Sequence, residues 1–417
     1  MQPTIEEGQR AQQRDSRKFI NVVTRWEPML KQFSSIWTCT RLLLVFSTAA
    51  FSCSISSAQK ASPNHLNLAT VARSTSLSGS PTPEDPKSAI LAAFDKYEVV
   101  GMDAAHGNKD LDDLILRLLR DPAFPTKVND IVVECGNSLY QPVLDRYIAG
   151  GDVKPSEVQQ VWRNTTQPMC SVSGFYEILF PLVRRINERV PAERKLRVLA
   201  GDPPLDWGKV KEKSQVMLNR DLNIALVMEK EVLSKHRKAL MLFGTFHLFH
   251  KNKIAPKGLE SAVELYETHY PGVTIVIGTM MIFDSSTAPP ADGEIETRMA
   301  PWPVPSLIRQ IKGTWLMDIN KYYFSEMVDA YLYLGPTDLL LSEPRPAEIF
   351  LNKEYMAELR RRTEIIGDKF LTYQTDPDQA SDDQFSPFLY GAIRAGPLGP
   401  TVIVEPPPKS SPSPDKR

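Results

Sequence analysis

Acidic residues and histidines follow several short apolar stretches of the sequence, at the point where each stretch ends. Asp103 and His106 follow "YEVVG", Glu134 ends "DIVVE", Asp202 follows "LRVLAG", and His247 comes three residues after "ALMLFG". A histidine with a carboxylate beside it can accept a proton from water near neutral pH. These residue types indicate acid–base chemistry, provided that the fold brings them together.

The four candidate catalytic residues have different predicted roles. His106 is the candidate general base, and Asp103 or Glu134 would fix its tautomer and raise its basicity. His247 would stabilise an oxyanion or protonate a leaving group. Asp202 is a candidate substrate-binding residue, although an aspartate before two prolines is also typical of a turn.

The same side chains are suitable ligands for a metal ion. His106, His247 and Glu134 together would suit a divalent transition metal such as zinc or manganese, with positions left open for a ligand. Residue types alone do not separate this alternative from acid–base catalysis by the side chains. The leading interpretation requires no cofactor.

The apolar stretches predict the strands that position these residues. Six short stretches rich in β-branched residues end near Gly101, Glu134, Gly201, Gly244, Gly278 and Gly335, and amphipathic segments lie between them. This alternation predicts an α/β fold, a three-layer αβα arrangement with a mainly parallel sheet. Predicted helices cover 109–121, with Asn108 as the cap, and 139–149, 172–189, 218–235, 259–266 and 353–363.

Ligands of open parallel sheets bind outside the carboxyl ends of the strands. The fold prediction therefore places the acids and histidines at one edge, as a single site. The sequence contains no P-loop, no G-x-S-x-G and no H-E-x-x-H. Ser138 is predicted to cap the helix that follows it rather than to act as a nucleophile.

Proline-rich segments and an N-terminal apolar stretch predict the domain organisation. Residues 1–58 form an extension with a signal peptide, because an apolar stretch at 42–55 precedes small residues ending at Ala58. Residues 59–87 are a predicted linker, 88–368 the α/β domain, and 369–417 a disordered tail. A proline-rich insertion late in the chain, 283–327, is predicted to be a lid or subdomain.

The predicted signal peptide implies export to the periplasm or the extracellular space. The alternative is a single membrane anchor formed by the same apolar segment. Cys135 and Cys170 would remain in the mature chain, where they could form a disulfide or stay as free thiols. The chain has 49 basic and 50 acidic residues, so it lacks the excess of positive charge that is typical of nucleic-acid-binding proteins. The predicted partner is a small-molecule substrate.

The strand-end residues also resemble a known family. "MDAAHGNKD" is similar to the G-E-x-x-H-G signature of erythromycin esterase-like proteins, and "IVVE" and "GTFH" resemble the later acid and histidine of that superfamily. The superfamily includes haem-binding uptake (ChaN-like) proteins and the Tiki and TraB proteins. The resemblance covers about residues 99–278 and is strongest to uncharacterised bacterial members.

The resemblance implies a role for each matching residue. Asp103 stands where the esterases have Glu, His106 matches their general base, and Glu134 and His247 match the second acid and second histidine. Arg220, followed by Asp221, resembles an Arg–Asp pair on a helix that faces the site, which makes Arg220 a candidate substrate-binding residue. The alternative for this pair is a salt bridge on a helix surface.

The leading functional prediction is an exported hydrolase that activates water against an ester, lactone or amide. The sequence lacks the G-x-S-x-G motif of serine hydrolases, so water is the expected nucleophile and no acyl-enzyme is expected. One alternative is an uptake protein that binds haem or a metal through His106 and His247 without turnover. Another is an inactive scaffold of the same superfamily, because Met102 and Asp103 depart from the esterase signature.

Overall fold

A computed structural model describes residues 80–104, 107–251, 260–279, 294–309, 311, 314–316, 324–336 and 339–367. These residues belong to a compact unit that begins at Ser80. The predicted signal peptide, most of the predicted linker and the predicted tail lie outside the described residues, as does His106. No helix within the described ranges is long and apolar enough to cross a bilayer.

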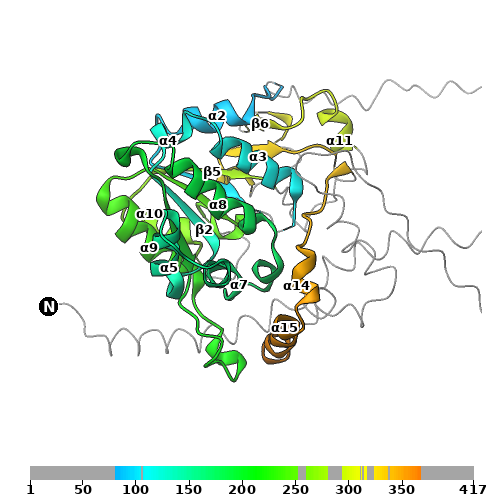
Figure 1. Ribbon diagram of the computed structural model, residues 1–417. Coiled ribbons are helices and arrows are strands. Elements are labelled where there is room, and N and C mark those ends of the chain that lie inside the picture. The colour runs from blue at the N-terminus through cyan, green and yellow to red at the C-terminus, as the bar shows by residue number, and fades with distance from the viewer. Residues whose placement is uncertain are drawn as a thin grey trace, which may run out of the picture. The chain divides into compact units, whose positions relative to one another are not determined.

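A seven-stranded, mainly parallel sheet forms the centre of the unit (Figure 1). Its strand order is β3-β2-β4-β1-β5-β7-β6, and only the β6–β7 pair is antiparallel. The six predicted strands and the α/β class are confirmed. The strands are β1 (Val99–Asp103), β2 (Asp130–Asn137), β3 (Arg197–Asp202), β4 (Ala239–Phe243), β5 (Thr274–Gly278), β6 (Ser306–Ile308) and β7 (Ala330–Tyr333).

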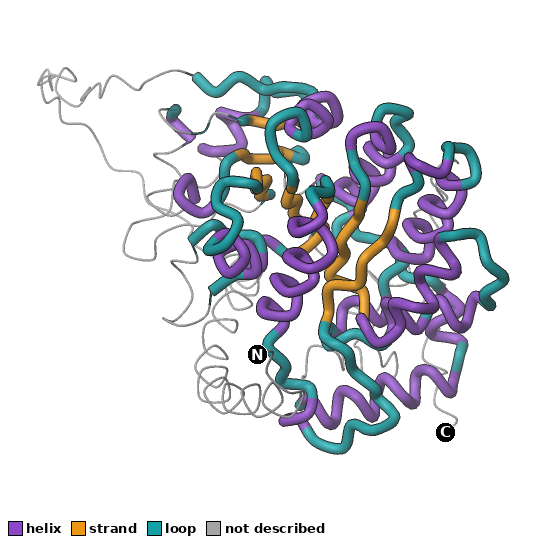
Figure 2. Tube along the Cα trace, turned by 90° about the vertical axis from the view of Figure 1, so that its left-hand side faces the viewer, coloured by secondary structure: helices purple, strands orange, loops and turns teal. Residues whose placement is uncertain are grey.

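Successive side chains of each strand enter opposite apolar layers, because a strand has a side-chain period of two. In β4, Leu240 and Leu242 belong to one core cluster, while Met241 and Phe243 belong to the other. Helices cover both faces of the sheet (Figure 2). The predicted three-layer αβα arrangement therefore follows from strands that are buried on both faces.

Helices of the first layer pack on the face that carries Leu240 and Leu242. Asn108 caps α3 by accepting a hydrogen bond from the Leu111 backbone N–H, as predicted. The helices of this layer are α2 (Pro86–Ala93), α3 (Lys109–Leu119), α4 (Phe124–Lys127), α5 (Gln141–Ile148), α6 (Pro155–Val158), α7 (Gln160–Arg163) and α8 (Phe175–Asn187).

The second layer packs on the face that carries Met241 and Phe243. It contains α9 (Arg220–Val227), a π-helical turn (Met228–Val232), α10 (Ala262–Glu267), α11 (Glu294–Met299) and α13 (Phe324–Met327). At the C-terminal end of the described chain, α14 (Ala347–Leu351) and α15 (Lys353–Ile366) form a small cluster with Val172 of the 3-10 turn Pro168–Val172. These two helices therefore pack outside the two main layers.

The antiparallel strand β6 was not predicted, because it lies in the proline-rich segment 283–327. It pairs with β7, so this part of the predicted lid or subdomain extends the main sheet. The other edge of β6 is bridged by Glu84, whose backbone N–H donates to the Leu307 carbonyl at 2.9 Å. Residues 80–87, assigned to the linker from sequence, thus belong to the compact unit.

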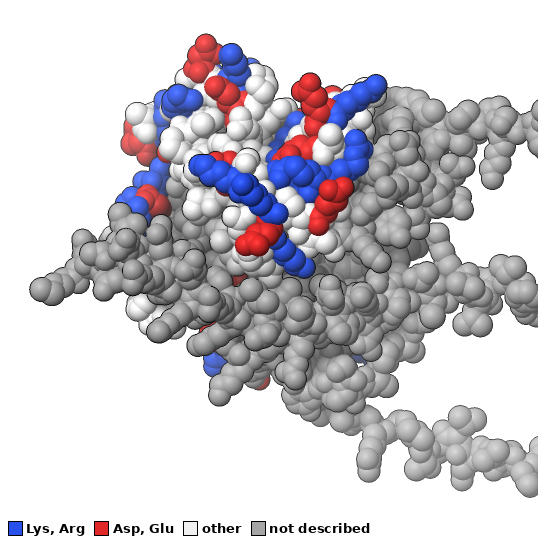
Figure 3. All heavy atoms as spheres, turned by 90° about the horizontal axis from the view of Figure 1, so that it is seen from below, with Lys and Arg blue, Asp and Glu red and all other residues white. Residues whose placement is uncertain are grey.

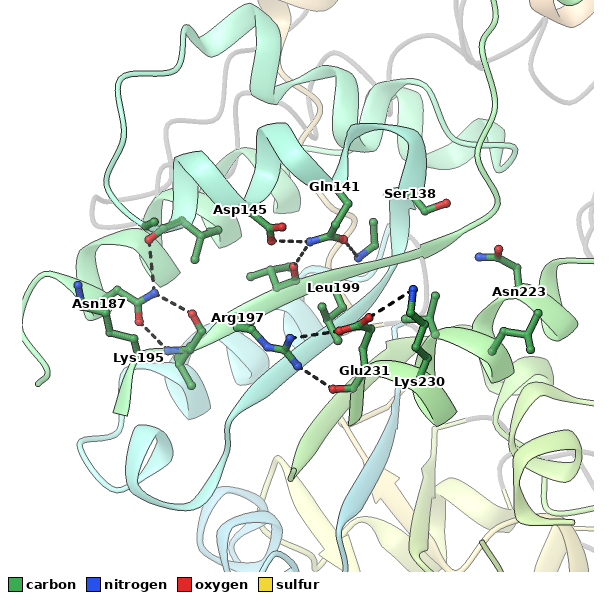
Figure 4. A pocket seen from close by; sticks show the side chains of 17 residues that line it. Ser138, Gln141, Asp145, Asn187, Lys195, Arg197, Leu199, Asn223, Lys230 and Glu231 are labelled. Atoms are coloured by element: carbon green, nitrogen blue, oxygen red, sulfur yellow. Dashed lines mark hydrogen bonds and ion pairs between the residues drawn. The ribbon is translucent and has the colours of Figure 1, made fainter. Parts of the chain in front are cut away.

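The edge strand β3 lies in a groove of about 560 Å³ between α5 and α9 (Figure 4). The Gln141 amide accepts from the Ala200 N–H at 2.7 Å and donates to the Val198 carbonyl at 2.9 Å. The Asn187 amide makes the equivalent pair of bonds with the backbone of Leu196. Side-chain amides therefore occupy polar groups that an edge strand would otherwise offer to another chain.

After β2, one predicted contact is absent and one open alternative is decided. Ser138 does not cap the helical segment that it begins; the Asn137 side chain does, by accepting from the Leu139 N–H. Cys135 and Cys170, left open from the sequence, form a disulfide whose two residues are fully buried. This bond ties β2 to the turn Pro168–Val172.

The described charged side chains are mixed in sign on the face seen in Figure 3. Lysines and arginines alternate there with aspartates and glutamates over the exposed described surface. This pattern agrees with the near-equal numbers of basic and acidic residues in the chain.

Replacing Cys135 and Cys170 by alanine should lower the free energy of unfolding by about 2–4 kcal/mol, because the bond closes a long loop in the unfolded chain. Urea unfolding of the variant and the native protein measures this difference. As a control, thiols are alkylated after denaturation without reductant. The disulfide is contradicted if Cys135 and Cys170 carry the label, since in the uncleaved chain the expected label maps only to Cys39 and Cys53.

Candidate functional site

Polar residues lie at or just after the carboxyl ends of four neighbouring strands, β1 to β4. Asp103 and Asp202 are the last residues of β1 and β3, and Glu134 lies in β2 where its register with β3 shifts. His247 lies in the 3-10 turn Thr245–His247 that follows β4. Because these strands are adjacent in the order β3-β2-β4-β1, their carboxyl ends lie side by side.

Arg220, the first residue of α9, connects two of these strand ends. Its Nη2 donates to Glu134 Oε1 at 2.7 Å and its Nε donates to Asp202 Oδ1 at 2.8 Å. The Glu134 and Asp202 side chains are buried, so each carboxylate needs a charged partner. Burial acts to lower the pKa of Arg220, but both carboxylates outweigh it and hold that pKa above its ordinary value.

This geometry decides the alternatives left open for Arg220 and Asp202. Arg220 does not form a helix-surface salt bridge with Asp221; its guanidinium reaches the buried strand ends. Asp202 accepts hydrogen bonds from the Thr166 hydroxyl at 2.7 Å and from the Thr166 backbone N–H, besides that from Arg220. Asp202 therefore supports Arg220, and neither side chain is a free turn residue.

His247 lies between Asp221 and Glu134. Its Nδ1 is 2.8 Å from Asp221 Oδ1, and its Nε2 is 3.6 Å from Glu134 Oε1 and 3.3 Å from Arg220 Nη1. Burial acts to lower the pKa of His247, whereas the charges of Asp221 and Glu134 raise it to about 9. A protonated His247 would act as a proton donor rather than a base, and its Nε2–H would then face Glu134 instead of accepting from Arg220.

Asp103 ties β1 to the turn that carries His247. Its carboxylate accepts from the Thr245 backbone N–H at 3.1 Å and from the Thr279 hydroxyl. Glu134 supports the same turn, because its Oε2 accepts from the Gly244 N–H at 2.7 Å. Two strand-end acids thus fix the backbone that leads into His247.

His106, the predicted general base, lies outside the described residues, so its distance to His247 stays untested. The residues around it are held by backbone hydrogen bonds. Ala104 donates to the Phe243 carbonyl at 2.9 Å, and the Gly107 carbonyl accepts from Glu343 at 2.8 Å. Gly107 has a φ of 88°, a left-handed conformation that glycine adopts without strain.

Sequence reasoning missed Glu343, which bridges two helices beside these strand ends. Its carboxylate accepts from the Ser173 hydroxyl at 2.7 Å and from the Phe175 N–H at 2.6 Å, so it caps α8 from a distant part of the chain. The neighbouring Ser342 pairs with Asn108 at the start of α3. No local sequence signal marks Glu343, because its partners are about 170 residues away.

Asp221 was noted from sequence only as the neighbour of Arg220. In the structure it accepts from His247 Nδ1 and from the Ala262 N–H at 2.9 Å, and thereby joins α9 to the start of α10. The adjacent Arg220 and Asp221 marked this helix start as part of the site, but the sequence did not indicate that Asp221 binds His247.

A second histidine after β4, His250, also lies between two carboxylates. Its ring nitrogens are each 2.7 Å from an acid, Nδ1 from Glu267 and Nε2 from Asp329. Burial opposes protonation, but these partners raise the pKa of His250 to about 9. His250 joins the segment after β4 to α10 and β7, and lacks the contact with Arg220 that His247 makes.

The described part of the predicted metal-ligand set does not suit a cation. His247 Nε2, which would have to face the metal, instead lies 3.3 Å from the Arg220 guanidinium. Glu134 uses one oxygen for Arg220 and the other for Gly244. Among the described residues, no cluster of three or more His, Cys, Asp or Glu side chains has a geometry that could hold a metal ion.

Comparisons with known proteins assign no family to the chain. No family model matches it, and no curated protein matches it. A Bacillus cereus protein solved as a structural-genomics target matches with 12% identity and a TM-score of 0.36 over 59% of this chain and 89% of its own. A succinoglycan biosynthesis protein matches with 10% identity and a TM-score of 0.42 over 61% and 94%. At these values neither likeness indicates a function for this chain.

Proposed function

We propose that the protein is a hydrolase of the erythromycin esterase-like superfamily that uses water against an ester, lactone or amide. The observation that carries the proposal is the network in which Arg220 joins Glu134 and Asp202 at the carboxyl edge of a parallel sheet, with His247 Nε2 3.6 Å from Glu134 Oε1. Charged side chains are rarely buried together without a functional or structural demand. The network lies at the edge where open α/β sheets bind ligands.

His247 is the proposed proton donor and oxyanion-stabilising group. Its Nδ1–H is held by Asp221, and its Nε2, which lies 3.6 Å from Glu134 Oε1, is the nitrogen that would donate to a substrate oxygen that gains negative charge. Asp221 is therefore a positioning residue for the imidazole. Because His247 is already protonated at neutral pH, a different group must accept the proton of the attacking water.

His106 is the proposed acceptor of that proton. The proposal rests on its sequence position three residues after Asp103, at the end of the strand next to β4. Water attack at the carbonyl would break the ester or amide bond directly, with the proton passing to His106 and the leaving group protonated by His247.

We also propose that the protein is exported. The buried disulfide between Cys135 and Cys170 supports this, because stable disulfides are typical of oxidising compartments. N-terminal sequencing of the protein recovered from a bacterial host tests the proposed cleavage after the 42–55 apolar stretch. A chain that keeps Met1 and remains in the cytosol would contradict export.

The proposed activity is tested with purified full-length protein against a panel of esters, lactones and amides. Replacing His247 by Gln should lower kcat by about 100- to 1,000-fold, the usual effect of losing a group that stabilises an oxyanion. His250→Gln is a matched control, because His250 has the same type of carboxylate partners but no contact with Arg220. An equal loss in both variants, or no turnover by the native protein, would refute the proposal.

Activity should also fall as the pH rises through about 9, because His247 then loses its proton. Loss of protons from His247 and His250 also changes the free energy of unfolding. The folded-state pKa values of His247 and His250 lie above the ordinary value of 6.5, so their stabilisation is complete below pH 6.5 and is lost as the pH approaches 9.

Urea unfolding at pH 6, 7.5 and 9.5, on either side of that interval, should show a decreasing free energy of unfolding. The decrease should be smaller in a His247→Gln, His250→Gln double variant. A free energy that rises over this interval would contradict the assignment of both histidines as cations.

A further inference from the structure

Asp202 is fully buried and depends on protein donors for its charge. Its side chain is 0% exposed, so solvent does not replace a donor that is lost. Its Oδ1 accepts from Arg220 Nε at 2.8 Å and from the Thr166 hydroxyl at 2.7 Å, and its Oδ2 accepts from the Thr166 backbone N–H. Two of the three hydrogen bonds from described residues therefore come from Thr166.

The charge of Asp202 depends on the balance between burial and these donors. Burial raises the pKa of Asp202, whereas the Arg220 charge and both Thr166 hydrogen bonds lower it, and burial has the larger effect. A carboxylate in such a position stays charged at neutral pH only while its donors stay in place. Loss of the Thr166 hydroxyl would therefore raise the pKa of Asp202 further and weaken its attraction for Arg220.

Arg220 transmits a change at Asp202 to the other side chains of the candidate site. Its Nε donates to Asp202, and its Nη2 donates to Glu134 Oε1 at 2.7 Å. Because the guanidinium is planar and its donor directions are fixed, a shift at Nε also moves Nη2. Glu134 in turn accepts from the Gly244 N–H, directly before the turn that carries His247. The geometry between Glu134 and His247 thus depends on Asp202.

Thr166 lies in the connection between α7 and α8, and the backbone just before it is held by side chains from other elements. The Asn137 amide, at the end of β2, donates to the Asn164 carbonyl at 2.7 Å. Trp207 Nε1, in the segment after β3, donates to the Thr165 carbonyl at 3.1 Å. Connections between helices usually tolerate movement. Here the fixed backbone gives both donors of Thr166 a defined direction.

The disulfide between Cys135 and Cys170 ties the same connection to the sheet. Cys135 follows Glu134 in β2, and Cys170 lies four residues after Thr166. The bond therefore joins the strand that provides one carboxylate partner of Arg220 to the connection that supports the other. It restrains the separation of these two carboxylates in addition to the pairing of β2 with β3.

We propose that Thr166 is a positioning residue, which holds Asp202 as the carboxylate partner of Arg220. The disulfide between Cys135 and Cys170 fixes the connection from which Thr166 acts. Thr166 contacts no reacting group and acts only through Asp202. Its effect on catalysis rests on the proposed function, whereas its effect on the charge of Asp202 is independent of any activity.

Variants of two neighbouring threonines separate this role from a general effect on folding. Thr166→Val removes the hydroxyl and keeps the backbone N–H, and Thr166→Ser keeps both donors. Thr165→Val is the matched control, because the Thr165 hydroxyl donates only to carbonyls of its own connection, those of Trp162 and Gln167. Urea unfolding of the full-length variants is measured at pH 4 and pH 7.5.

The expected result is a pH-dependent effect of the Thr166 hydroxyl. The folded-state pKa of Asp202 lies above the ordinary value of 3.8, so its charge costs stability increasingly as the pH rises above that value. Loss of a donor increases this cost, and Thr166→Val should therefore lower the urea midpoint more at pH 7.5 than at pH 4. The shifts of Thr166→Ser and Thr165→Val should not depend on pH. A Thr166→Val shift that is equal at both pH values, or that persists in an Asp202→Asn background, would overturn the proposal.

Turnover of the panel of esters, lactones and amides tests the effect on catalysis. Thr166→Val should lower kcat by about 10- to 100-fold with a smaller change in KM, as expected when a catalytic group is displaced. Thr166→Ser should retain the native kcat. The Cys135→Ala, Cys170→Ala double variant should also lower kcat, and a native kcat in that variant would overturn the role of the disulfide.

The two measurements separate this inference from the proposed function. If Thr166→Val shows the pH-dependent loss of stability but the native protein hydrolyses no substrate, the support of Asp202 by Thr166 stands and hydrolysis fails. If the native protein is active and Thr166→Val has the same kcat as Thr165→Val, hydrolysis stands and the positioning role fails. A pH-dependent loss of stability together with a lower kcat, both absent from Thr166→Ser, supports both.

Discussion

The placement of Arg220 between two buried carboxylates is the interaction on which the candidate site depends. Glu134 and Asp202 come from adjacent strands, and removing two negative charges from water at this edge would be costly without a cation between them. Arg220 is the first residue of α9, so the helix must begin at this point for its guanidinium to reach both acids. The position of α9 then places Asp221 against His247.

Much of this arrangement could be predicted from local patterns. Strands buried on both faces give continuous β-branched stretches, and a polar residue that follows such a stretch marks the strand end. Asp103, Glu134 and Asp202 were located in this way, and the structure brings Glu134, Asp202, Arg220 and His247 together. The Asn108 cap was equally local, because a cap and its helix are adjacent in sequence.

Contacts between distant segments could not be predicted. Glu343 caps α8 across about 170 residues, and the Asp221–His247 pair joins a helix to a strand end. Strand β6 lies in a segment whose prolines indicate a loop, yet it pairs with β7 at the end of the strand order, and a single bridge to Glu84 contacts its other side. The disulfide likewise depends on the distance between Cys135 and Cys170, which composition does not contain.

His247 and His250 show why a shifted pKa alone does not identify a site. Both lie near two carboxylates, and both have a pKa raised to about 9. The acids around His250 hold the segment after β4 against α10 and β7, which is a structural task. His247 differs because its Nε2 faces a guanidinium and a buried glutamate at the carboxyl edge of the sheet. The surroundings of the second ring nitrogen, rather than the size of the shift, distinguish the candidate catalytic histidine from the structural one.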